Sequence, residues 1–138
     1  MIDALSHVNW FAVLVASIAH FVLGGIWFAG LVGKHYAAAL GIAGQPQQKT
    51  GPLFLAGPFV CGAITITTTA ILLRALGITT YSDALPLGVL VGVGYLMPMT
   101  VTIAINPLFP RPFAYALVNA PFFITGSLMS CAILVALS

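Results

Sequence analysis

The sequence predicts an all-α integral membrane protein with four transmembrane helices in an up-down-up-down bundle. Three observations predict this fold class. Only 4% of the 138 residues are charged, against about 25% in an average soluble domain. Apolar residues of the set AVILMFWYC make up 61% of the chain. Four apolar stretches each exceed the roughly 20 residues that cross a bilayer at about 1.5 Å per residue. Because so few charges cannot cover a water-soluble surface, we expect lipid to be the solvent.

The four predicted spans contain no charged residue. They cover residues 8–30, 53–73, 84–105 and 113–137 of one expected domain. Strands are excluded as spans because an open sheet leaves backbone groups unpaired in hydrocarbon. Barrel strands would alternate over about 10 residues, and these runs are continuous. The first span is longer than the apolar part of a signal peptide and follows Asp3 rather than a basic residue, so we expect it to be retained.

The connections between the predicted spans differ in length and stiffness. Residues 31–52 form the longest connection, in which residues 34–40 are predicted to form a short helix at the lipid headgroups. Residues 77–83 form a short turn. Residues 106–112 include three prolines, which fix their φ angles. Short connections join antiparallel neighbours, which favours the up-down-up-down order.

Basic residues are unequally divided between the two predicted faces of the membrane. Cytoplasmic loops are enriched in Lys and Arg, which predicts cytoplasmic first and third connections and both termini on the other side. The side chains that decide this orientation are Lys34, Lys49 and Arg111 on one face, against Arg74, Asp3 and Asp83 on the other. We expect Lys34 and Arg111 to lie at lipid headgroups, where Arg111 either anchors the loop or holds a lipid phosphate.

Several function classes conflict with this composition. The net charge of +2 is scattered, so no nucleic-acid surface is expected. Acid–base catalysis needs convergent groups, and the two carboxylates, Asp3 and Asp83, are far apart. A metal site takes three or four ligands, and His7 and His35 are expected beyond opposite ends of the span that holds His20. No phosphate loop, G-x-S-x-G, H-E-x-x-H or C-x-x-C motif occurs. We therefore expect no enzyme, no metal and no cofactor.

The two cysteines are not expected to pair. Cys61 lies about 9 residues into the second span and Cys131 about 18 into the fourth, so their depths differ by roughly 13 Å. A disulfide needs Cα atoms within about 7 Å. We predict two free, buried thiols that act as small apolar groups.

Small and polar residues recur on one face of each predicted span at helical spacing. Lipid gives no hydrophobic attraction between helices, so such residues mark the faces that contact other helices. We expect these stripes to face the bundle interior or a subunit interface. They are Asn9, Ala12, Ala16, His20, Gly24 and Trp27; Gly57, Cys61, Thr65 and Thr68; Gly88, Gly92, Tyr95, Met99, Thr102 and Asn106; and Tyr115, Asn119, Gly126 and Ser130.

His20 is the only ionisable side chain predicted near a bilayer centre, which makes it a candidate functional residue. Thr65, Thr68, Tyr95 and Ser127 are expected at a similar depth. Three roles are open for the imidazole. It bonds a facing hydroxyl or carbonyl and fixes helix packing, it forms a ligand or proton site, or it ligates a metal or haem.

Two further features of the spans have alternative interpretations. The spacing of Gly88 and Gly92 allows close helix approach, either within the chain or in a dimer. Pro98 and Pro121 each remove a backbone hydrogen bond inside a span. Each proline either only shapes its helix, or the carbonyls that it frees contribute to a pocket or a hinge.

Several segments resemble a known family. Asn9-Trp10-Phe11-Ala12-Val13 and Gly24-Gly25-Ile26-Trp27-Phe28 bound the first span, and Gly33-Lys34 follows it. Asp83-Ala84-Leu85-Pro86-Leu87-Gly88 begins the third span. Leu117-Val118-Asn119-Ala120, Gly126-Ser127-Leu128-Met129 and Ala132-Ile133-Leu134 belong to the fourth. These segments resemble the bacterial membrane family catalogued as domain of unknown function 1761. The family's Asn-Ala-Gly-Tyr pattern is Asn119-Ala120-Pro121-Phe122 here. The resemblance implies a small four-helix membrane protein and brings no activity, substrate or catalytic residue.

Taken together, we expect a non-enzymatic protein of the bacterial inner membrane, a homo-oligomer with a polar-lined intramembrane site for a small or lipidic ligand. Four short helices enclose little volume, so a pathway is expected between subunits. The alternative is an accessory or structural subunit of a larger membrane complex. The expected ligand-binding residues are Asn9, His20, Thr68, Tyr95, Asn106 and Asn119. The expected helix-packing residues are Ala12, Ala16, Gly24, Gly57, Gly88, Gly92 and Gly126.

Overall fold

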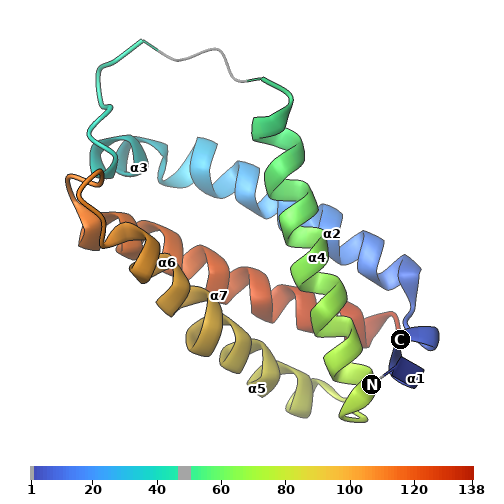
Figure 1. Ribbon diagram of the computed structural model, residues 1–138. Coiled ribbons are helices and arrows are strands. Elements are labelled where there is room, and N and C mark those ends of the chain that lie inside the picture. Colours follow the sequence, from blue (N-terminus) through green and yellow to red (C-terminus); the bar gives the residue numbers. More distant parts are fainter. Residues whose placement is uncertain (1, 47–50) are drawn as a thin grey trace.

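The computed structural model describes residues 2–46 and 51–138, and within these residues the chain forms helices and turns but no strand (Figure 1). Four helical segments are long and apolar enough to span a membrane: Trp10–Leu31, Leu53–Ala75, Tyr81–Ala104 and Pro112–Ala136. The predicted all-α fold class with four such helices is therefore confirmed. Lys49, which the orientation prediction uses, lies outside the described residues.

The first span is formed by α2 (Trp10–Gly25) and the π-helix η1 (Ile26–Leu31), after the short α1 (Ile2–Ser6). Asn9 starts α2, because its Oδ1 accepts hydrogen bonds from the backbone N–H groups of Phe11 and Ala12 at 3.1 and 3.2 Å. This satisfies two N–H groups that have no partner within the helix. The short α3 (Gly33–Ala39) follows in the first connection.

The second and fourth spans are single helices, α4 (Leu53–Ala75) and α7 (Pro112–Ala136). The buried residues of α4 all lie in its second half, from Ile66 to Leu73. Those of α7 extend from Ala116 to Leu134. Helix α7 contacts α2, α3, α5 and α6, so it is the central helix of the bundle (Figure 1).

The third span is divided into α5 (Tyr81–Val91), the π-helix η2 (Gly92–Leu96) and α6 (Met97–Ala104). Its inward positions recur at every fourth residue: Gly88, Gly92, Leu96, Thr100 and Ala104 are buried or half-buried. The predicted stripe instead continued through Tyr95 and Met99, which are 69% and 61% exposed. That part of the stripe prediction is wrong, because the wide π turn rotates the rest of the span by about one residue relative to a regular helix.

The two ends of the bundle are each joined by a contact between distant segments. At one end the Asn9 Nδ2 donates to the Leu137 carbonyl at 2.6 Å, and both termini lie there (Figure 1). At the other end Gly41, with φ of 72°, meets Pro110 so closely that an added Cβ would lie 2.9 Å from the proline Cγ. The first and third connections therefore lie together, away from the termini.

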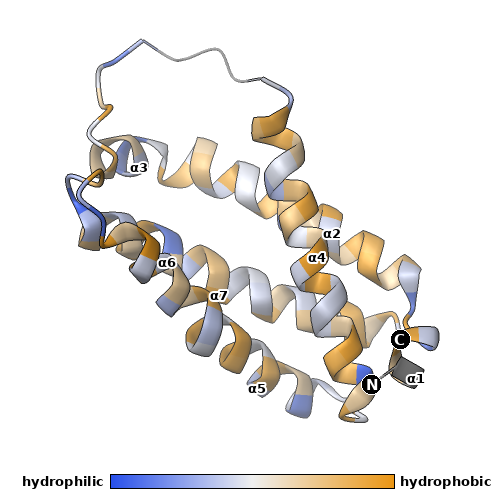
Figure 2. Ribbon diagram, viewed as in Figure 1, coloured by the Kyte–Doolittle hydropathy of each residue, from blue (hydrophilic) through white to orange (hydrophobic). Residues whose placement is uncertain are grey.

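The apolar core is concentrated near the termini. It is built from Val8, Ala12, Val13, Ala16, Ile66, Ala70, Leu73, Ala84, Leu87, Cys131 and Leu134. Large apolar side chains outside this core are exposed, such as Phe11 at 65% and Leu117 at 76%. Figure 2 shows that hydrophobic residues recur along all the long helices. This is the arrangement expected when hydrocarbon surrounds the bundle.

Candidate functional site

A cavity of about 630 Å³ lies between α2, α4 and α7, in the part of the bundle that the apolar core does not fill. It exists because the first half of α4 is separated from α7 (Figure 1) and contributes no buried residue. One chain therefore forms a cavity whose volume lies within the usual range of about 300–1,000 Å³ for small-molecule sites. The expectation that a pathway forms between subunits stays a prediction.

The imidazole of His20 occupies a slot between two glycines of neighbouring helices. A Cβ on Gly126 of α7 would lie 2.6 Å from His20 Cε1 and 2.7 Å from Nδ1, and a Cβ on Gly62 of α4 would lie 3.3 Å from Cδ2. The Phe122 ring lies against the imidazole, with centroids 5.1 Å apart. The two glycines therefore give the imidazole the room that it occupies.

Three buried polar groups at this wall have no hydrogen-bond partner among the described residues: His20 Nδ1, Ser127 Oγ and Ser130 Oγ. Several other hydroxyls in the spans bond the carbonyl four residues earlier, as Ser17 does to Val13 at 2.7 Å. Each buried group without a partner costs about 1–3 kcal/mol. His20, Ser127 and Ser130 all line the cavity. The role of His20 as a helix-packing residue or as a ligand residue stays a prediction.

Asn119 lines the same cavity farther along α7 and is 4% exposed. Its Nδ2 donates to the Tyr115 carbonyl at 2.8 Å. Among the described residues its amide oxygen makes no hydrogen bond, which leaves an acceptor available on this wall. Trp27 supports the same stretch of α7 by donating from Nε1 to the Val118 carbonyl at 3.0 Å.

Aromatic rings form a continuous row from the third connection to His20. Adjacent centroids are 4.8–5.7 Å apart, distances typical of favourable ring contacts. The rings, in order, are Phe109, Tyr115, Tyr36, Phe28, Phe122 and His20. Burial and the neighbouring Tyr115 hydroxyl raise the pKa of Tyr36, which lies in α3 outside the spans, to about 12. The phenol of Tyr36 is thus neutral at physiological pH.

The structure brings two of the six predicted ligand-binding residues, His20 and Asn119, to the cavity. Asn9 caps α2 near the termini. Thr68 is exposed on the outside of α4 and donates to the Ile64 carbonyl at 3.0 Å. Tyr95 is also exposed, and Asn106 accepts a hydrogen bond from the Leu108 backbone N–H within the third connection. These four residues do not line this cavity.

Sequence reasoning did not include Ser127, Ser130, Gly62 and Phe122 among the site residues. The sequence pattern does point to the two serines, since Ser130 shares the helical stripe of Asn119 and Gly126, and Ser127 is expected at the depth of His20. It does not point to Gly62 and Phe122, because their importance depends on where the imidazole ring lies.

Most of the small residues expected at helix contacts lie at such contacts. Ala12 and Ala16 are buried, and Gly24 faces Phe122. The pair Gly88 and Gly92 faces α7, where added Cβ atoms would lie 3.1 Å from Leu128 Cα and 2.9 Å from Ile124 Cα. This motif therefore serves contact within the chain. Gly57 differs from the prediction, because an added Cβ there would meet no atom within 4 Å.

Both cysteines are free, as expected, but only Cys131 is buried. Cys61 is exposed and lines the cavity, so the predicted burial of Cys61 is wrong. The physical reason is the uncovered first half of α4.

Within residues 2–46 and 51–138, no group of three or more His, Cys, Asp or Glu side chains could hold a metal ion. Lys34 and Arg111 are exposed at the end where the first and third connections meet.

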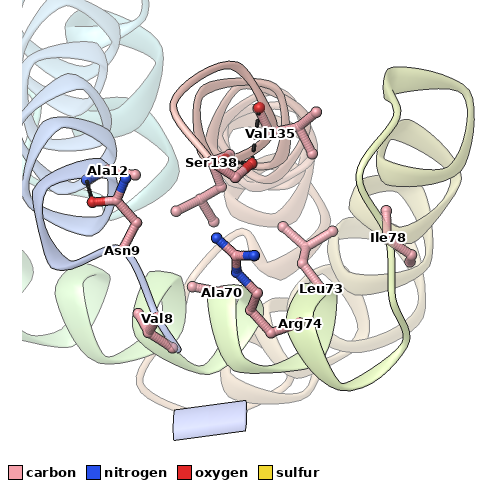
Figure 3. A pocket seen from close by; sticks show the side chains of 10 residues that line it. Val8, Asn9, Ala12, Ala70, Leu73, Arg74, Ile78, Val135 and Ser138 are labelled. Atoms are coloured by element: carbon pink, nitrogen blue, oxygen red, sulfur yellow. Dashed lines mark hydrogen bonds between the residues drawn. The ribbon is translucent and has the colours of Figure 1, made fainter. Parts of the chain in front are cut away.

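A second, small cavity of about 20 Å³ lies near the termini (Figure 3). Its lining includes Asn9, Arg74 and Ser138, and the Arg74 guanidinium is directed toward the end of α7. This volume is sufficient for about one water molecule. The large cavity is therefore the candidate ligand site.

These features define a class of protein: an all-α chain with four helices able to span a membrane and a cavity between three of them. The family described as protein of unknown function (DUF1761) matches residues 11–135. The chain belongs to this family, which confirms the resemblance seen in its sequence. No curated protein and no solved structure matches the chain.

Proposed function

We propose that the chain is an integral membrane protein that binds a small or lipidic ligand in the cavity between α2, α4 and α7, without catalysing a reaction. The observation that carries this proposal is the cavity of about 630 Å³ with three unpartnered polar groups at one wall. These atoms are covered by protein, and rotation about χ1 would turn the serine hydroxyls toward a ligand. A ligand that bonds to them would recover part of the free energy lost by burying them.

The proposal is tested by narrowing the cavity and measuring what copurifies with the protein. Thr65 lines the cavity, whereas Thr68, three residues later in α4, is exposed outside it. Protein extracted from its native membrane in mild detergent is analysed by mass spectrometry for bound non-protein compounds. We expect a compound that is present in the wild type and in Thr68→Phe but lost from Thr65→Phe. Equal amounts in the two variants would overturn the proposal.

We propose for the whole molecule the up-down-up-down order, in a bacterial inner membrane, with the first and third connections in the cytoplasm. The positions of Lys34 and Arg111 at the end opposite the termini support this orientation.

Homo-oligomerisation also stays a proposal. Because Gly88 and Gly92 contact α7 within the chain, a dimer would have to use another face. Native mass spectrometry from nanodiscs distinguishes a monomer from an oligomer.

A further inference from the structure

We infer that the ligand of this cavity is an uncharged amphiphile whose head carries a hydroxyl or carbonyl oxygen held beside His20. This inference rests on the proposed function and adds the chemical class of the ligand. Three properties of the cavity lead to it: the charge of its lining, the grouping of its polar atoms, and the shape of its apolar walls.

The lining carries no formal charge. Among the described residues that surround the cavity, none is Asp, Glu, Lys or Arg. An ionised head without a counter-charge costs several kcal/mol or more in a low-dielectric environment. The cavity therefore disfavours carboxylates, ammonium groups and phosphodiester headgroups. An uncharged head avoids this cost.

The polar groups near His20 suit one oxygen-bearing head. A neutral imidazole has one donor and one acceptor nitrogen, and each serine hydroxyl both donates and accepts. Gly126, which contacts the imidazole, lies within four residues of Ser127 and Ser130, or about 6 Å along α7. The serine hydroxyls lie in the wall, and rotation about χ1 alone reorients them. A hydroxyl or carbonyl oxygen beside His20 can therefore bond to this group.

Asn119 lies seven residues from Gly126, about 10 Å along the helix. It is too distant to share the same head and faces the other end of the ligand. Between these two positions the walls are apolar. Phe28 and Phe122 form one side, and Phe54, Leu55 and Pro58 of α4 form the other. An alkyl chain or a flat ring fits between such walls, which favours an amphiphile over a fully polar solute.

The test uses matched twelve-carbon probes and the thiol of Cys61, which is exposed in the cavity lining. Protein in phosphatidylcholine nanodiscs is treated with methyl methanethiosulfonate, and a Cys61→Ala variant gives the background from Cys131. The probes are 1-dodecanol, 2-dodecanone, dodecane, dodecanoate and dodecyltrimethylammonium. We expect 1-dodecanol or 2-dodecanone to protect Cys61 at about tenfold lower concentration than the other three, as one net hydrogen bond allows. The better of the two identifies a hydroxyl or a carbonyl head.

Variants locate the head. Ser130→Ala and His20→Phe should each remove most of the advantage of the oxygen-bearing probe over dodecane and leave protection by dodecane unchanged. Thr68→Ala, outside the cavity, should retain the advantage. Equal protection by dodecanoate or dodecyltrimethylammonium, or an advantage that survives both variants, would overturn the inference. If copurification shows a bound compound but no oxygen-bearing probe protects Cys61, the ligand class is wrong while the proposed function stands.

Discussion

At the scale of single residues, the position of His20 depends on two residues that have no side chain. Gly62 and Gly126 leave the slot in which the imidazole lies, and its Nδ1 is left without a partner among the described residues. His20 and Gly126 could be predicted from helical spacing, since both fall on small and polar stripes. Gly62 could not be predicted, because the small and polar stripe of its span passes through Cys61 instead. Only the position of the imidazole ring reveals that Gly62 contacts it.

Gly126→Ala is expected to lower the free energy of unfolding by about 1–3 kcal/mol, because the new methyl group overlaps the His20 ring. Gly57→Ala in α4 is the matched control, since its methyl group meets no atom within 4 Å and alanine favours a helix by up to about 1 kcal/mol. Circular dichroism during thermal unfolding in detergent measures both. Equal stabilities of the two variants would contradict the glycine slot.

The raised pKa of Tyr36 predicts a loss of stability at high pH. An unfolded tyrosine ionises near pH 10, whereas burial and Tyr115 hold the folded pKa at about 12. Between these values the unfolded state binds fewer protons, so stability falls as the pH rises through this window. Thermal unfolding from about pH 9 to about pH 12 should show a smaller fall for Tyr36→Phe than for the wild type. The same fall in both proteins would exclude Tyr36 as the cause.

At the scale of elements, the π-helices explain where prediction from periodicity succeeded and failed. The first span keeps its predicted face through Ala12, Ala16, His20 and Gly24, because η1 begins only after them. In the third span η2 lies in the middle, so the face predicted at 100° per residue is wrong from Tyr95 onward. Gly92, at the start of η2, contacts Ile124 of α7, and periodicity within the span does not predict this contact.

The contact between η2 and α7 is expected to be intolerant of added volume. In Gly92→Ala the new methyl group would lie 2.9 Å from the Ile124 Cα, and backbone cannot move aside as a flexible side chain can. We expect a loss of about 1–3 kcal/mol in the free energy of unfolding. Gly94→Ala, two residues away and exposed, is the control, with its nearest contact at 3.8 Å from Leu90 Cδ1. Should Gly92→Ala prove as stable as Gly94→Ala, the described contact would be wrong.

At the scale of the whole molecule, the bundle is filled near the termini and hollow toward the first and third connections. The four helices and their apolar exteriors could be predicted from composition and length alone. The cavity could not, because it depends on the path of α4 relative to α7, which no pattern within a single span determines. For the same reason Asn9, Thr68, Tyr95 and Asn106 shared stripes with site residues yet lie elsewhere.

The contact between Asn9 and the Leu137 carbonyl places both termini together, which predicts the same reporter signal from either end. Alkaline phosphatase fused to the N- or the C-terminus should be active in both cases when expressed in a bacterium, because we propose that both ends lie outside the cytoplasm. An insertion after Leu108, in the third connection, should be inactive. Opposite activities at the two termini would rule out the proposed even number of crossings.

The wide turn of η2 also affects comparisons among members of the family. A π turn holds a residue that a regular helix would leave out, so a one-residue deletion within residues 92–96 could relax this turn to an ordinary helical one. The flanking halves of the span would then keep their faces. A sequence alignment with such a relative must therefore allow a gap of one residue within this segment. Without that gap, Leu96 of this chain would be equated with a lipid-facing neighbour in such a relative.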